Sequence, residues 1–134
     1  MVATIGNAFG MSVVGWSRNL THSRAKQFGV NLVTKETLLA ISDIVSIHLV
    51  LSELSKGLIG DPELSLMKPT AFLVNTSRGP IIEESALIKA LRANKIAGAG
   101  LDVFDQEPLP INHPFLELDN TVITPHLGYV TNET

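Results

Sequence analysis

An arginine, two carboxylates and a histidine follow three apolar runs in the second half of this sequence. Arg78 comes after the run that begins at Ala71. Asp102 ends a run of small residues, with Glu107 just beyond it, and His126 follows the last run. Because the carboxyl ends of parallel strands share one edge of a sheet, where ligands bind in open α/β folds, these groups can converge. They would supply an anion clamp, an orienting acid and a proton-transfer group.

Each of these residues also has an ordinary structural interpretation. Taken alone, Arg78 is a solvated loop charge, and Glu107 is a solvated charge before a proline. Asp102 would cap the turn that follows its strand, since aspartate side chains accept hydrogen bonds from nearby backbone amides. A lone histidine such as His126 is more often structural or exposed than catalytic. Their predicted convergence on one sheet edge favours a functional site.

Strands and helices alternate in the pattern that would position these residues. The stretch Ala71 to Gly79 begins as a strand that we expect to be buried on both faces and then turns polar. Alternation of this kind predicts a parallel sheet with helices on both faces. Strands are predicted at Met11–Gly15, Val30–Val33, Asp43–Leu51, Ala71–Val74, Ala97–Phe104 and Thr121–Thr124. Helices are predicted at Met1–Phe9, Thr21–Phe28, Lys35–Ile41, Asp61–Met67 and Glu83–Ala93, with Thr21, Thr34 and Asp61 as N-caps and with Gly10 and Gly29 at helix ends.

Composition narrows the class of protein. The 134 residues are 45% hydrophobic, which predicts one modest globular domain. A net charge of -3 without a basic tract argues against nucleic acid and anionic membranes as partners. No apolar run approaches the ~20 residues of a membrane span, and no signal pattern opens the chain, so we expect a cytoplasmic protein. Without cysteine or a histidine–carboxylate pair at metal spacing, no metal site is predicted.

Four ordered motifs contain Arg78, Asp102, Glu107 and His126. They are Asn75-Thr76-Ser77-Arg78-Gly79, Gly100-Leu101-Asp102-Val103-Phe104, Glu107-Pro108 and Thr124-Pro125-His126-Leu127-Gly128. The motifs resemble those of the D-isomer-specific 2-hydroxyacid dehydrogenases, and the resemblance covers essentially the whole chain. That family includes glycerate, lactate and phosphoglycerate dehydrogenases and glyoxylate/hydroxypyruvate reductases. The resemblance implies an NAD(P)-dependent oxidoreductase that transfers hydride between a nicotinamide cofactor and a small D-2-hydroxy or 2-oxo acid.

The same resemblance assigns roles to individual residues. Arg78 would hold the carboxylate and carbonyl of the 2-oxo acid, and His126 would protonate the carbonyl oxygen as hydride arrives. Glu107 would pair with His126, and a carboxylate beside an imidazole favours its charged form. These three form the implied catalytic set. The implied cofactor-binding residues are Ser17, Arg18, His48, Val50, Thr76, Ser77, Arg78, Asp102, His126 and Gly128, with Asp102 at the nicotinamide end.

The choice of cofactor depends on the end of the strand that begins at Met11. NAD-specific sites place an acid there for the ribose 2'-hydroxyl, whereas arginine suits a 2'-phosphate. Ser17 occupies the acidic position and Arg18 follows it, so we predict NADP in preference to NAD. The alternative is that Arg18 points to solvent and NAD is used. Val50 stands where the family usually has proline, on the adenine side of the site.

The glycine-rich turn of a dinucleotide fold is missing from the sequence. Gly6 and Gly10 lie at the end of the helix that such a turn should start. We therefore expect a Rossmann-like, doubly wound parallel sheet lacking its first strand and glycine-rich turn. Residues 1–134 would form a partial dinucleotide-binding domain, without the family's substrate-side domain. In the strand order 3-2-1-4-5-6 the missing strand leaves a gap between the strands at Met11 and Asp43. A weakened, association-prone sheet with open edges should result.

Two alternatives to a working dehydrogenase follow from this incompleteness. The chain could be a non-catalytic nucleotide-binding or scaffold protein, as corepressor-like relatives of the family are, or an inactive truncated product. An intact Arg78, Glu107 and His126 does not separate these alternatives from an enzyme. The resemblance further implies a homodimer for the full-length protein.

Overall fold

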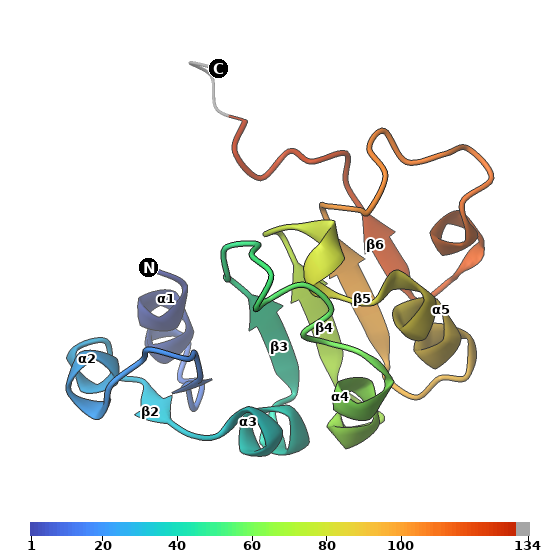
Figure 1. Cartoon of the computed structure of the whole chain (residues 1–134). Coiled ribbons are helices and arrows are strands. Elements are labelled where there is room, and N and C mark those ends of the chain that lie inside the picture. The colour runs from blue at the N-terminus through green and yellow to red at the C-terminus, as the bar shows by residue number, and fades with distance from the viewer. Residues whose placement is uncertain (131–134) are drawn as a thin grey trace.

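Parallel strands alternate with helices throughout the computed structural model, which describes residues 1–130 (Figure 1). This arrangement confirms the α/β, Rossmann-like class predicted from the sequence. The strands are β1 (Val14–Gly15), β2 (Asn31–Leu32), β3 (Ile44–Ile47), β4 (Phe72–Asn75), β5 (Gly98–Leu101) and β6 (Thr121–Ile123). The helices are α1 (Val2–Ala8), α2 (His22–Gln27), α3 (Lys35–Ile41), α4 (Asp61–Leu66) and α5 (Glu84–Arg92), with 3₁₀ turns η1 (Gly79–Ile81) and η2 (Pro114–Glu117).

The strands form two separate parallel sheets. One has the order β3-β4-β5-β6 and the other consists of β1 and β2. Within residues 1–130 no backbone ladder joins β1 to β3, and the two strands stand apart in Figure 1. The predicted gap between these strands is therefore present. Association through the open edges stays a prediction.

The core lies on one face of the four-stranded sheet. Helices α3, α4 and α5 cover this face (Figure 1), and Leu73 of β4 and Leu87 of α5 are almost completely buried there. On the opposite face Ile44, Phe72 and Val122 are half or more exposed. The expectation that the Ala71 strand is buried on both faces was therefore wrong. Crossovers that run in one direction along a parallel sheet share one hand, so α4 and α5 fall on the same side.

The helix ends confirm several local predictions. Gly10 has φ +77°, and the N–H groups of Gly10 and Met11 donate to Asn7 and Gly6 in the 5→2 and 6→1 pattern of a glycine-terminated helix. Thr21 and Thr34 accept hydrogen bonds from backbone amides three residues later, as N-caps do. Gly10 thus ends α1 and is not part of a phosphate-binding turn.

Several predicted boundaries were wrong. β1 begins at Val14 and not at Met11, and β5 ends at Leu101 and not at Phe104. β3 ends at Ile47, four residues before Leu51, because its ladder stops where β4 ends, at the pair Ile47 and Asn75. Gly60, not Asp61, is the N-cap of α4, and its N–H donates to the Glu63 carboxylate at 3.1 Å. Among the described residues, no helix is both long and apolar enough to cross a membrane.

Candidate active site

The buried side chain of Asn75 shapes the turn that carries Arg78. Asn75 ends β4 and is 1% exposed. Its Oδ1 accepts from the Ser77 N–H at 3.0 Å, and its Nδ2 donates to the Arg78 carbonyl at 2.9 Å. The Ser77 hydroxyl donates to the Leu49 carbonyl at 2.7 Å, which joins this turn to the chain after β3. The Arg78 side chain then projects from a fixed backbone, and the residue itself is exposed.

Gly79 brings this turn against the loop after β5. A Cβ at Gly79 would lie 2.1 Å from the Phe104 carbonyl carbon and 2.6 Å from the Asp105 nitrogen. Real Cβ atoms do not approach backbone atoms so closely, and the contact therefore requires glycine. Arg78 and the loop that carries Glu107 are placed side by side by this contact.

Asp102 lies beneath the turn that carries His126. It is 5% exposed, and its Oδ1 accepts from the Thr124 hydroxyl and from the Leu127 N–H. Its Oδ2 accepts from the Gly128 N–H at 2.8 Å. Asp102 therefore caps the distant turn that carries His126 and not the turn that follows its own strand, as the ordinary interpretation had it. Its contact with the nicotinamide end of a cofactor stays a prediction.

His126 and Glu107 form a close pair at the carboxyl edge of the sheet. The His126 Nδ1 lies 2.6 Å from Glu107 Oε2, and the Phe104 N–H donates to the other Glu107 oxygen at 3.0 Å. His126 has φ +56°, a left-handed conformation that is uncommon for any residue except glycine. The Tyr129 ring meets the imidazole edge to face, with centroids 5.4 Å apart. An unfavourable backbone conformation at this residue fits a functional position.

The electrostatics link all three predicted catalytic residues. The hydrogen bond with His126 holds the pKa of Glu107 below its ordinary value, and the charge of Arg78 contributes in the same direction. Glu107 is therefore ionised near neutral pH and accepts, so the imidazole Nδ1 must donate. Nε2 is then the ring nitrogen left to face a reactant. The predicted convergence of Arg78, Glu107 and His126 thus has geometric support.

Asp102 offers a test of how the His126 turn is held. Burial alone would raise the pKa of Asp102, but the hydrogen bonds from Thr124, Leu127 and Gly128 outweigh it and the pKa is lowered. Asp102→Asn would set an amide N–H against a backbone donor. We expect it to lower the free energy of unfolding at pH 7 by about 2 kcal/mol. Urea unfolding measured from pH 7 downward checks this value.

The pH dependence of that test follows from the sign of the shift. A carboxyl group whose pKa is depressed in the folded state stabilises the fold above its unfolded pKa, and this contribution is lost as the pH falls through the folded pKa. The difference in the free energy of unfolding between wild type and Asp102→Asn should therefore become smaller as the pH falls. Asp105→Asn is the matched control, because burial and the neighbouring Glu84 raise the pKa of Asp105. Neutralising Asp105 should leave stability at pH 7 equal or higher. A similar loss in both variants would contradict the assigned role of Asp102.

The predicted cofactor residues follow the strands at the same edge. Ser17 and Arg18 come after β1, and one Arg18 N–H donates to the Leu54 carbonyl at 3.3 Å. After β3, the His48 ring lies 2.9 Å from the Ser46 hydroxyl and Val50 is 86% exposed. The other members of the set, Thr76, Ser77, Asp102 and Gly128, follow β4, β5 and β6. An open edge with a guanidinium and several hydroxyl groups fits an elongated anionic nucleotide.

Sequence reasoning missed the contributions of Asn75 and His113. The position of Asn75 at the end of an apolar run was visible, but its buried hydrogen bonds were not. His113 received little weight because it lies in a loop, yet its Nε2 is 3.0 Å from Glu84 Oε1. Neither residue touches the proton-transfer pair directly. Asn75 holds the turn that carries Arg78, and His113 lies at the far end of the loop that carries Glu107.

Comparisons with known proteins agree with this geometry. A family model described as D-isomer specific 2-hydroxyacid dehydrogenase, NAD binding domain, matches residues 1–128. Glyoxylate reductase of Aeropyrum pernix is 50% identical over 133 residues, which are 99% of this chain and 40% of that protein. Glyoxylate/hydroxypyruvate reductase B of Yersinia enterocolitica is 44% identical over 126 residues, covering 94% of this chain and 39% of that protein.

A solved structure extends the comparison to three dimensions. The NAD-complexed D-isomer specific 2-hydroxyacid dehydrogenase of Lactobacillus delbrueckii ssp. bulgaricus has a TM-score of 0.86 at 33% identity. The match covers 97% of this chain and 43% of that one. The chain therefore spans about two-fifths of the length of the relatives it matches.

Proposed function

The chain belongs to the D-isomer-specific 2-hydroxyacid dehydrogenase family, and we propose that it supplies the nucleotide-binding and proton-transfer side of an NAD(P)-dependent oxidoreductase. Two observations support this proposal: the Glu107–His126 pair at 2.6 Å, and the contact at Gly79 that sets the Arg78 turn against the loop of Glu107. Reduction of a 2-oxo acid needs a cation that binds the carboxylate and a proton donor on one side of the carbonyl group. Residues 1–134 would act as a partial dinucleotide-binding domain.

Three side chains have separate roles in the proposed reaction. The guanidinium of Arg78 binds the carboxylate of a 2-oxo acid and orients its carbonyl group. His126, protonated on both ring nitrogens, gives the Nε2 proton to the carbonyl oxygen, and Glu107 stabilises the imidazolium through Nδ1. A bound nicotinamide supplies the hydride that reduces the carbonyl carbon. In the opposite direction, neutral His126 takes the hydroxyl proton.

The substrate class follows from the same groups. A 2-oxo acid presents a carboxylate and a carbonyl oxygen on adjacent carbons, which suits a cation beside a proton donor. Glyoxylate and hydroxypyruvate, which appear in the names of the relatives, are the first substrates to assay. Intact-mass analysis of the natural protein should first establish its length. Turnover should then be measured on a protein of that length. NAD(P)H-dependent reduction supports the proposal, whereas nucleotide binding without turnover of any small 2-oxo acid favours a scaffold role.

Nucleotide titration tests the cofactor preference. We propose that Ser17 and Arg18 favour NADPH, since no acid follows β1 to repel a 2'-phosphate. NADPH should bind more tightly than NADH, and Arg18→Ala should weaken NADPH binding about tenfold, equivalent to roughly 1.4 kcal/mol. NADH affinity should change little. Fluorescence titration of the purified chain measures both.

Arg92→Ala is the matched control, because Arg92 is an exposed arginine at the end of α5, which leads into the amino end of β5. It should leave both affinities unchanged. Equal binding of the two nucleotides by wild type and Arg18→Ala would overturn the NADP preference and leave NAD as the cofactor. Failure of the folded chain to bind either nucleotide would count against the proposed function itself.

A further inference from the structure

The loop that carries Glu107 runs from Val103 to His113 and is exposed around that residue. Its first residues, Val103 and Phe104, are buried, whereas residues 105–108 are exposed. The hydrogen bond from the Phe104 N–H to Glu107 is internal to the loop. Two residues after Glu107, Leu109 packs against the core. The position of Glu107 relative to His126 therefore depends on both flanks of the loop, including its far end.

His113 anchors that far end. Its Nε2 lies 3.0 Å from Glu84 Oε1, and its Nδ1 accepts from the Phe115 N–H at 3.3 Å. Because Nδ1 accepts, the ring proton lies on Nε2 and is donated to Glu84. The imidazole also packs on the Phe115 ring, with centroids 5.0 Å apart. The imidazole is held by three contacts, and its side chain is only 12% exposed.

Glu84 belongs to a rigid part of the molecule. It is the first residue of α5, a helix whose Leu87 and Leu91 are buried in the core. A carboxylate in the first turn is also favoured by the helix dipole. The bond between Glu84 and His113 therefore attaches the loop to the core and not to another flexible segment.

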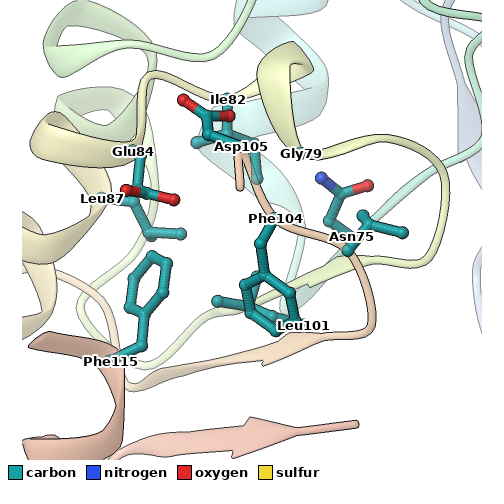
Figure 2. Close-up of a pocket in the computed structure, with 10 residues that line it drawn as sticks. Asn75, Gly79, Ile82, Glu84, Leu87, Leu101, Phe104, Asp105 and Phe115 are labelled. Atoms are coloured by element: carbon teal, nitrogen blue, oxygen red, sulfur yellow. The ribbon is translucent and has the colours of Figure 1, made fainter. Parts of the chain in front are cut away.

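The Asp105 carboxylate lies near Glu84 and adds to the importance of the hydrogen bond between Glu84 and His113. Glu84 and Asp105 line a cavity of about 10 Å³ together with the rings of Phe104 and Phe115 (Figure 2). Burial, and after it the charge of Glu84, raises the pKa of Asp105, whereas Lys56 and His113 act in the opposite direction. Asp105 lies only two residues before Glu107. Loss of the hydrogen bond between His113 and Glu84 would leave the two carboxylates at this cavity without that donor.

We propose that His113 and Glu84 are positioning residues whose hydrogen bond holds the loop against α5 and so keeps Glu107 paired with His126. The catalytic consequence rests on the proposed function. The positional consequence does not, because it concerns only contacts within this chain. The sequence contains one sign of this positioning role, namely a histidine directly before Pro114 at the end of a loop.

The test follows the Glu107 carboxyl group by ¹³C NMR during a pH titration of the chain. His113→Ala should raise the pKa of Glu107 toward its ordinary value, because the loop no longer holds it against His126. Glu84→Ala should do the same to a smaller extent, since it also removes the repulsion of Asp105. Glu84→Gln keeps an acceptor for the His113 N–H and should leave the titration unchanged.

Lys89→Ala is the matched control on α5. It removes an exposed ion pair with Asp61 that does not touch the loop, and the Glu107 titration should not move. If His113→Ala does not fold, the comparison of the Glu107 titration in Glu84→Ala and in Glu84→Gln decides whether the hydrogen bond positions the loop. An unchanged Glu107 titration in a folded His113→Ala or Glu84→Ala chain overturns the proposal, as does a shift in Glu84→Gln.

Turnover provides a second measurement. If the protein reduces a 2-oxo acid, His113→Ala should lower kcat about tenfold while nucleotide affinity and KM stay near the wild-type values. Glu84→Gln should retain wild-type kcat. An equal fall in nucleotide affinity and kcat would indicate general loss of structure and overturn the positioning role. Absence of turnover in wild type would reject the proposed function, while the NMR titration would still decide the role of His113.

Discussion

Gly79→Ala should destabilise the fold by about 3 kcal/mol or more, because the added methyl group would overlap backbone atoms that cannot rotate away. A methyl carbon on Gly79 would lie 2.1 Å from the Phe104 carbonyl carbon and 2.3 Å from its oxygen. Relief requires the Arg78 turn and the Glu107 loop to separate. For a domain with roughly 5–15 kcal/mol of stability, this loss is a large fraction. Urea unfolding at pH 7 and an amide NMR spectrum measure it.

Gly100→Ala is the control for this prediction. Gly100 lies in β5, and a Cβ there would meet the Val74 side chain at 3.8 Å, an ordinary contact. That variant should keep or slightly increase stability, since alanine loses less backbone entropy than glycine. Equal unfolding midpoints for Gly79→Ala and wild type would show that the two loops do not pack as closely as the geometry indicates. The joint placement of Arg78 and Glu107 would then need another explanation.

Local features of the fold were predictable because adjacent residues determine them. Thr21 and Thr34 cap helices through amides three residues away, and Gly10 and Gly29 end helices through their own positive φ. The gap beside β3 followed from the strand order 3-2-1-4-5-6 of the dinucleotide fold and from the missing glycine-rich turn. Only the helix ends needed no knowledge of which segments meet in space.

The supporting contacts of the site could not be predicted in the same way. Asp102 accepts from donors at Leu127 and Gly128, which lie 25 and 26 residues further along the chain. His113 meets Glu84 across 29 residues. Each residue alone had an ordinary interpretation, and only the fold shows which acceptor meets which donor. Exposure of Phe72 was missed for a related reason, because an apolar run does not report how many faces of its sheet are covered.

His126→Asn should remove the proposed proton donor while preserving the turn. Asparagine tolerates the left-handed region better than most residues, so the φ of +56° at this position should cost little. We expect reduction of a 2-oxo acid to slow by about 10²–10⁴-fold, the usual contribution of a positioned acid. Nucleotide affinity should stay within about threefold, less than ~1 kcal/mol. Steady-state kinetics and fluorescence titration on the same preparation separate the two effects.

Glu107→Gln distinguishes proton transfer from a merely structural role of the pair. Glutamine can still hydrogen-bond to the imidazole but carries no charge. The Glu107 carboxylate lies 2.6 Å from His126 Nδ1, where its negative charge stabilises the imidazolium that reduction requires. Without that charge, reduction should decline at a lower pH than in wild type, whereas His22→Gln, an exposed histidine at the start of α2, should change nothing. An unaltered pH profile in Glu107→Gln, combined with normal rates in His126→Asn, would mean that the pair supports the turn and that another group moves the proton.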